Sequence, residues 1–307
     1  MIRGLASAVS VVSVVCAGCM GVVSALASCS SSSAAPAQTG DSGVPDVGTQ
    51  PDVNDGGIPD VGTQPDVNDG GGATVIDAPS QSTFATDAGT IHMACQGSGA
   101  LPVIFLAGGG DPGTIWSGIV SALGPGVLTC TFDRPGVAPS YQPGMLETPQ
   151  FFADALAQVL SEANIGSRFL VVGHSVAGIV LRVFGASYAS RVAGAVFLDP
   201  TVPSFIAMDD AGQLAMAGFD PQLTVSEGNA VTTWMSTATV TVLSHDPAWA
   251  AGVGFPNQAG WELGQKAYAQ LTPNGTQMDV PGASHYVFKD KPAVVVAAIQ
   301  SILQTAH

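Results

Sequence analysis

Residues 171–178 read Val-Val-Gly-His-Ser-Val-Ala-Gly, and the fold is decided here. The run that ends in this stretch, 168–173, has the length and apolar character of a buried strand, whereas 176–188 has helical length and spacing. Ser175 therefore lies where a strand turns sharply into a helix. Such a turn admits only small side chains two residues before and after the serine, here Gly173 and Ala177. The pattern predicts a nucleophile elbow.

On both sides of this turn, short apolar runs alternate with segments of helical spacing. We expect strands at 82–86, 90–96, 102–107, 127–133, 168–173, 193–199, 239–244 and 276–280. We expect helices near 115–123, 149–163, 176–188, 261–271 and 293–303. Thr148 and Pro149 suit the N-cap and first position of the second helix. Near-continuous apolar strands alternating with helices predict an α/β fold whose mostly parallel sheet is covered on both faces.

Four segments, in the same order along the chain, resemble the serine α/β-hydrolase superfamily of esterase and lipase type. They are LPVIFLAGGG (101–110), TFDRPGVAPS (131–140), GHSVAGIVLRVFGASYASRVAGAVFLDP (173–200) and PGASHYVFKDKP (281–292). The resemblance covers residues 90–307. It implies an eight-stranded, mostly parallel sheet flanked by helices, with a short lid after the sixth strand.

The resemblance also implies a catalytic triad. Ser175 would be the nucleophile, activated by a base that takes its proton. His285, on the loop after the last strand, would be that base; the rival His245 ends the preceding strand, where the superfamily places an acid. The acid is either Asp199, which ends the sixth strand, or Asp246, which ends the seventh. We prefer Asp199, because FLDP closely matches one branch of the superfamily and the gap from Asp246 to His285 is long.

By position, the backbone N–H groups of Gly109 and Val176 would bind the oxyanion of a tetrahedral intermediate. The large apolar residues of the lid region, between residues 201 and 240, predict an apolar pocket for the acyl or the alcohol part of a substrate. These residues are Phe205, Met208, Met216, Phe219, Trp234 and Met235. The sequence contains no phosphate loop, dinucleotide motif or His/Cys cluster of metal-binding spacing, so we expect no cofactor and no metal.

Other polar residues are expected to be structural. Asp133 and Arg134 should hold a loop by local ion pairing, and His174, inside the elbow, should orient rather than react. The remaining candidates are structural or exposed: His92, Arg182 and His307.

The charge balance limits the possible partners. Lys and Arg number 8 against 23 for Asp and Glu, giving a net charge of −15. Without basic clusters the chain is not expected to bind nucleic acid or to dock electrostatically on anionic lipid. All aromatic residues lie beyond residue 80, so the packed domain should be 81–307.

The N-terminal segment predicts export. Residues 1–28 have one early base, Arg3, followed by small and apolar residues, which is typical of a signal peptide. Leu26-Ala27-Ser28-Cys29 resembles a bacterial lipobox, so Cys29 would be acylated and would anchor the protein in the cell envelope, at the outer membrane or cell surface; Cys19 is the weaker candidate. A plain secretory signal and a retained membrane helix are the alternatives. Residues 29–80 contain a nearly exact 14-residue repeat, 44–57 and 58–71, and predict a disordered tether.

Two cysteines, Cys95 and Cys130, remain once the signal and anchor are removed. In an exported protein they are expected to pair. The superfamily's strand order implies the same pairing, because it places their two strands side by side and antiparallel.

The leading functional hypothesis is a membrane-tethered serine hydrolase that cleaves a small carboxylic ester with an apolar part. The alternatives are another reaction on the same fold (peptidase, thioesterase, lactonase or cofactor-free haloperoxidase) and a non-catalytic surface binding module. Dehalogenase and epoxide hydrolase are disfavoured, because those branches use an Asp where this chain has Ser175.

Overall fold

The computed structural model describes residues 75–206 and 211–306. The expected signal peptide, Cys29, nearly all of the tether, Met208 and His307 lie outside these residues. We expected the packed domain to start at residue 81, but the described domain begins earlier in the chain. Strand β1 (Ile76–Asp77) pairs antiparallel with β4 (Ser98–Gly99), and Ile76 packs against the core. An apolar side chain therefore ties the end of the expected tether to the domain.

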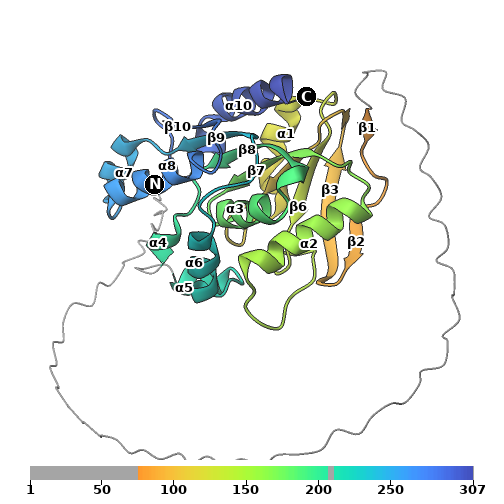
Figure 1. Cartoon of the computed structure of the whole chain (residues 1–307), viewed down its shortest axis with the longest axis horizontal. Helices are drawn as coiled ribbons and strands as arrows, with labels where there is room; N and C mark the ends of the chain where they lie inside the picture. Colours follow the sequence, from red (N-terminus) through yellow and green to blue (C-terminus); the bar gives the residue numbers. More distant parts are fainter. Residues whose placement is uncertain (1–74, 207–210, 307) are drawn as a thin grey trace, which may run out of the picture. The chain divides into compact units, whose positions relative to one another are not determined.

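The main sheet has eight strands in the order β10-β9-β8-β7-β5-β6-β3-β2 (Figure 1). The strands are β2 (Thr83–Thr86), β3 (Gly89–Gln96), β5 (Val103–Leu106), β6 (Thr129–Asp133), β7 (Phe169–His174), β8 (Val192–Leu198), β9 (Thr239–Ser244) and β10 (Gly275–Asp279). The strands from β10 to β6 are parallel neighbours, whereas β3 runs antiparallel to both β6 and β2. The expected eight-stranded, mostly parallel sheet is confirmed.

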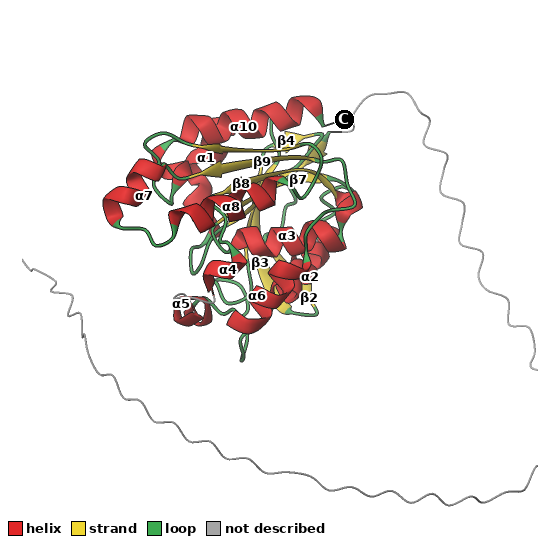
Figure 2. Cartoon of the chain, turned by 60° about the vertical axis from the view of Figure 1, so that its left-hand side comes forward, coloured by secondary structure: helices red, strands yellow, loops and turns green. Residues whose placement is uncertain are grey.

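Helices cover both faces of this sheet (Figure 2). One layer contains α1 (Ser117–Leu123), which follows the short η1 (Gly113–Trp116), together with α9 (Val287–Asp290) and α10 (Pro292–Thr305). The opposite layer contains α2 (Pro149–Glu162), α3 (Ala177–Ser187), followed by η2 (Ala189–Arg191), and α8 (Gln258–Ala269). Successive strand residues point to opposite layers. In β5, Ile104 and Leu106 join the α2–α3 core, while Val103 and Phe105 join the α1–α10 core.

Helix starts follow the expected local chemistry. The Thr148 side chain accepts a hydrogen bond from Phe151 N at 3.1 Å, and Pro149 occupies the first helical position of α2. The cap satisfies an N–H group that has no partner within the helix, and proline has no such group to satisfy. The predicted start of α2 is confirmed.

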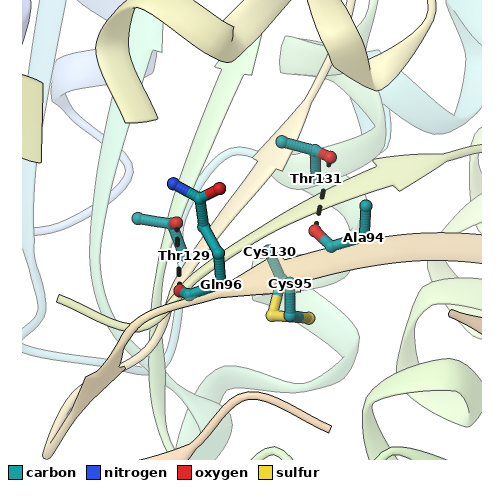
Figure 3. The surroundings of a disulfide bond; sticks show 6 residues. All are labelled: Ala94, Cys95, Gln96, Thr129, Cys130 and Thr131. Atoms are coloured by element: carbon teal, nitrogen blue, oxygen red, sulfur yellow. Dashed lines mark hydrogen bonds between the residues drawn. A yellow bond between two sulfur atoms is a disulfide. The ribbon is translucent and has the colours of Figure 1, made fainter. Parts of the chain in front are cut away.

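Cys95 and Cys130 form a disulfide between β3 and β6 (Figure 3). They are directly opposite in the antiparallel register, with their Cα atoms 4.1 Å apart. On either side, Thr131 Oγ1 donates to Ala94 O and Thr129 Oγ1 donates to Gln96 O, each at 3.4 Å. The predicted bridge is confirmed, and it joins the antiparallel strand β3 to β6, the last strand of the parallel part of the sheet.

The segment between β8 and β9 contains α4 (Pro203–Phe205), α5 (Ala211–Met216) and α6 (Pro221–Ala230). It occupies the place expected for the lid. The helix α7 (Pro247–Val253) follows β9. Within 75–206 and 211–306, no helix has both the length and the apolar character needed to cross a bilayer.

Candidate active site

Three candidate residues lie at one edge of the sheet because three neighbouring parallel strands end there. Ser175 follows β7, Asp199 follows β8 and His245 follows β9. The strands are in register as parallel neighbours, so their carboxyl ends lie side by side. His285 comes from the loop between β10 and α9. This edge is where open α/β sheets bind ligands.

Ser175 occupies the turn between β7 and α3 with a φ of 54°. Its N–H donates to Leu198 O at 3.2 Å, and its carbonyl accepts from Thr201 N at 3.0 Å, so β8 and its following loop hold the turn. A Cβ at Gly173 would lie 2.6 Å from Leu181 Cδ1, and one at Gly178 would lie 2.4 Å from Pro200 Cβ. Small residues are therefore required where the sequence has them, and the elbow forms with Ala177 in place of the usual glycine.

His285 is oriented by Asp199. Its Nδ1 lies 2.7 Å from Asp199 Oδ2, so the ring donates from Nδ1 to the carboxylate and carries its remaining nitrogen, Nε2, on the other side of the ring. His285 and Ser175 both line one pocket of about 760 Å³. The structure thus brings together Ser175, His285 and Asp199.

Asp199 is fully buried, yet both its carboxylate oxygens are satisfied. Oδ2 accepts from His285 and from His245 Nδ1 at 2.8 Å, while Oδ1 accepts from Trp261 Nε1 at 2.9 Å. Burial acts to raise its pKa, but the hydrogen bonds and charges of the two histidines outweigh it and lower the pKa of Asp199 to about 2. The carboxylate is therefore ionised wherever the protein is folded at ordinary pH.

Asp246, the other candidate acid, is partly exposed and does not contact His285 through its carboxylate. Its Oδ1 accepts from Ala248 N at 2.8 Å and caps α7, and its Oδ2 accepts from Gly282 N at 2.6 Å. These two N–H groups lower the pKa of Asp246. Asp246 therefore holds the turn that leads to His285. It does not hold the imidazole of His285.

His245, the rival base, is buried beneath the site and does not line the pocket. Its Nδ1 faces Asp199, and its Nε2 lies 2.9 Å from Gln258 Oε1. Neither ring nitrogen is left to accept a proton from Ser175. Its contact with Asp199 was not anticipated from the sequence; the only signal was that consecutive strands, β8 and β9, end in these two residues.

Thr201 and Trp261 are two further site residues that sequence reasoning missed. Thr201 Oγ1 lies 3.3 Å from Ser175 Oγ, and Tyr268 OH holds the Thr201 carbonyl at 2.8 Å. Thr201 lies only two residues after Asp199, which is the signal that could have found it. Trp261 comes from α8 and could not be located without the tertiary structure.

The glycine loop after β5 approaches the serine closely. A Cβ at Gly108 would lie 3.0 Å from Ser175 Cβ and 2.9 Å from His174 Nδ1, so only glycine fits there. Gly109 and Val176, the expected oxyanion donors, both line the pocket. Val176 is the N-cap of α3, where backbone N–H groups lack partners within the helix.

His174 lies beneath the His285 loop. Its Nε2 lies 3.0 Å from the backbone carbonyl of His285, and its ring packs on His285 and Phe288. Burial, more than any other effect, lowers the pKa of His174 to about 3. The ring is therefore neutral at ordinary pH and donates from Nε2.

The pocket is predominantly apolar. Its large apolar lining residues are Phe205, Leu214, Met216, Phe255 and Trp261. Only Phe205 and Met216 were among the lid residues named from the sequence. Phe219 and Trp234 are buried in the core instead, and Met235 is exposed.

Asp133 and Arg134 do not form the expected local ion pair. Asp133 Oδ2 binds His92 Nδ1 at 2.7 Å, whereas the Arg134 guanidinium lies over the Phe152 and Phe219 rings. Burial lowers the pKa of Arg134 to about 10. The two side chains diverge because consecutive residues at a strand end point in opposite directions. Arg182 is structural, as expected, and donates to Val231 O.

Residues 102–223 match the family model for the alpha/beta hydrolase fold. Over 91 residues the chain is 32% identical to an uncharacterised protein of Schizosaccharomyces pombe, a match that covers 30% of this chain and 17% of that protein. The chain spans less than half the length of the curated relatives it matches.

Solved structures show the same fold at low identity. An esterase from Thermogutta terrifontis is similar with a TM-score of 0.52 and 19% identity, covering 76% of this chain and 100% of that chain. An enol-lactonase from Burkholderia xenovorans is similar with a TM-score of 0.53 and 15% identity, covering 72% of this chain and 99% of that chain.

Proposed function

Since this chain has the α/β-hydrolase fold and residues 102–223 match the family model for that fold, we propose that it is a serine hydrolase that cleaves carboxylic esters. The observation that carries the proposal is the alignment of His285 on Asp199 beside Ser175. A buried, ionised carboxylate fixes one imidazole nitrogen, and the serine and the histidine line the same pocket. This is the arrangement that activates a hydroxyl as a nucleophile.

The reaction follows from these positions. Ser175 Oγ attacks the ester carbonyl carbon, and His285 Nε2 takes the hydroxyl proton. The N–H groups of Gly109 and Val176 bind the resulting oxyanion. The tetrahedral intermediate then collapses, and the alcohol leaves with the proton held by His285. Water, deprotonated by His285, attacks the acyl-enzyme in the same way and releases the carboxylic acid and the free serine.

The pocket supports a substrate with an apolar acyl or alcohol part. Its volume of about 760 Å³ and its aromatic and Met lining suit a small apolar ester. The similarity to an esterase supports this proposal, and the similarity to an enol-lactonase is a reason to include cyclic esters among the substrates tested.

Covalent labelling tests the proposal. A fluorophosphonate probe reacts only with an activated serine, so it should label wild-type protein at Ser175 and leave Ser175→Ala unlabelled. Ser301→Ala, which removes an exposed serine of α10, is the matched control and should label fully. Absence of label on correctly folded wild type would contradict the proposal and favour a binding module. Hydrolysis of p-nitrophenyl esters of increasing chain length should then rank the acyl groups that the pocket accepts.

We also propose that the chain is exported and anchored by a lipid on Cys29. Two observations support this: the lipobox-like Leu26-Ala27-Ser28-Cys29, and the Cys95–Cys130 disulfide, a bond typical of oxidising compartments. Cys29→Ala should move the protein from the membrane fraction to the soluble fraction, or leave it unprocessed, while Cys19→Ala keeps it anchored. If a processed Cys29→Ala protein were still found in the membrane fraction, the assignment would be refuted.

A further inference from the structure

One carboxylate oxygen of the site accepts hydrogen bonds from two imidazoles. Asp199 Oδ2 lies 2.7 Å from His285 Nδ1 and 2.8 Å from His245 Nδ1. The backbone N–H of His245 also donates to Asp199 Oδ1, at 3.3 Å. The hydrolytic mechanism above needs only the first of these three contacts. His245, whose side chain is completely buried, has no part in it.

The second ring nitrogen of His245 also faces an acceptor. Nε2 lies 2.9 Å from Gln258 Oε1. The amide of Gln258 is held in this orientation because its Nε2 donates to the carboxylate of Glu262 at 3.3 Å, which leaves only the oxygen to face the histidine. A neutral imidazole has one donor and one acceptor nitrogen. With oxygen acceptors on both sides, a neutral His245 would place one lone pair against another, whereas an imidazolium satisfies both contacts.

The surroundings of His245 favour that charge. The rings of Trp249 and Phe255 are each inclined to it by 62°, with centroids 5.1 and 5.0 Å away, and Trp261 stacks at 5.9 Å. Aromatic rings close to a desolvated cation stabilise it when their faces are presented, as that of Trp261 is.

The charged and titratable groups around His245 come from every element packed against it. They are Asp199 after β8, Asp279 in β10, Asp246 next in the chain, Glu262 through Gln258 in α8, and His285 across the shared oxygen. Burial alone would lower the pKa of His245, but Asp199 and the Gln258 hydrogen bond together raise it above its ordinary value.

We propose that His245 is a positioning residue, a buried imidazolium that fixes Asp199 and shares its charge with His285. The inference rests on the proposed hydrolase function and extends it to the pH range of the site. Two positive rings on one oxygen oppose each other, so a charged His245 weakens the hold of Asp199 on protonated His285. Removing the charge of His245 should therefore strengthen the hold of Asp199 on the protonated base.

The acidic limb of the kcat/KM–pH profile tests this directly. His245→Asn removes the charge but keeps an amide N–H donor at the position of His245 Nδ1, the nitrogen that faces Asp199. It should shift the limb to higher pH by about one unit or more, because the interaction between two unit charges a few ångströms apart inside a protein is worth at least that much. The matched control is His92→Asn, which replaces the imidazole of the His92–Asp133 pair and should leave the limb where it is in wild type. An unshifted limb in folded, phosphonate-reactive His245→Asn would overturn the proposal.

A second measurement needs neither activity nor a variant that folds. In wild-type protein at pH 7, long-range ¹H–¹⁵N correlation spectra should show both nitrogens of His245 protonated, and His245 neutral at that pH would overturn the proposal. Failure of the hydrolase function itself is separate, because it would appear as wild-type protein that fluorophosphonate does not label.

Discussion

Two of the three His–Asp pairs in the described residues have the same nitrogen–oxygen distance and different surroundings. His92 Nδ1 and His285 Nδ1 each lie 2.7 Å from the Oδ2 atom of an aspartate that ends, or directly follows, a parallel strand. His92, however, is within β3, directly opposite Asp133 in the β3–β6 register, three residues from the disulfide. His285 is on a loop and shares a pocket with Ser175. The aspartate–histidine bond is thus not what distinguishes the active site; the distinction comes from a loop histidine beside a serine at a tight turn.

Replacing the two aspartates should separate these roles most strongly. Asp199→Asn should lower kcat by about 10⁴, because His285 loses the carboxylate that holds its tautomer. Asp133→Asn should act through stability alone, by at most a few kcal/mol, with kcat recovered below the unfolding temperature. Ester turnover and the thermal midpoint, measured for both variants, distinguish them. Equal losses of kcat would mean that Asp199 has no special role.

Removal of the Cys95–Cys130 disulfide, which lies near His92, should have the second largest effect, and this effect should be on stability and not on activity. Removing the disulfide with Cys95→Ala and Cys130→Ala should lower the free energy of unfolding by about 3–4 kcal/mol, because a cross-link over this loop length restricts the unfolded chain. The kcat should be unchanged, since Ser175 and His285 are on other elements. Urea unfolding and ester turnover measure both. Two free thiols in non-reduced wild type, detected by mass spectrometry, would contradict the bridge.

Acid should weaken the site region through His174. Burial holds the pKa of His174 near 3, below its ordinary value of 6.5, so below pH 6.5 the unfolded state binds a proton that the folded state does not. Stability from this residue is therefore present at neutral pH and is lost as pH falls from 6.5, by on the order of 1 kcal/mol per pH unit. The difference in Tm between wild type and His174→Asn should shrink between pH 6.5 and 4. A constant difference would mean that His174 is not kept neutral by the fold.

Asp246→Asn should have a smaller effect than these. Asparagine can still cap α7 through its side-chain oxygen, and the carboxylate of Asp246 does not contact the imidazole of His285. We expect a substantial fraction of wild-type turnover. If this variant were inactive while Asp199→Asn remained active, the acid of the site would have been assigned to the wrong strand.

How far the sequence predicts the site depends on whether a residue's role is local. Ser175 and the cap of α2 were predicted because the turn and the helix start are determined by their neighbours in sequence. Asp199 and Asp246 could not be separated, because each follows a strand, and only the path of the His285 loop decides between them. The contact of His245 with Asp199 depends on the register of β9 against β8 and on the placement of α8. The pairing of Asp133 with Arg134 was wrong because adjacency in sequence does not imply that two side chains point the same way.

The left-handed backbone of Ser175, with a φ of 54°, implies a trade-off between stability and activity at the elbow. A side chain with a Cβ is strained in this conformation, and glycine is not. Of two inactive variants, Ser175→Gly should therefore be more stable than Ser175→Ala by about 1 kcal/mol, or a Tm higher by about 2–4 °C. Calorimetry on the two can measure this, and equal midpoints would show that the turn relaxes without its serine. The side chain at position 175 therefore makes the fold less stable than glycine would, and that same side chain is the proposed nucleophile.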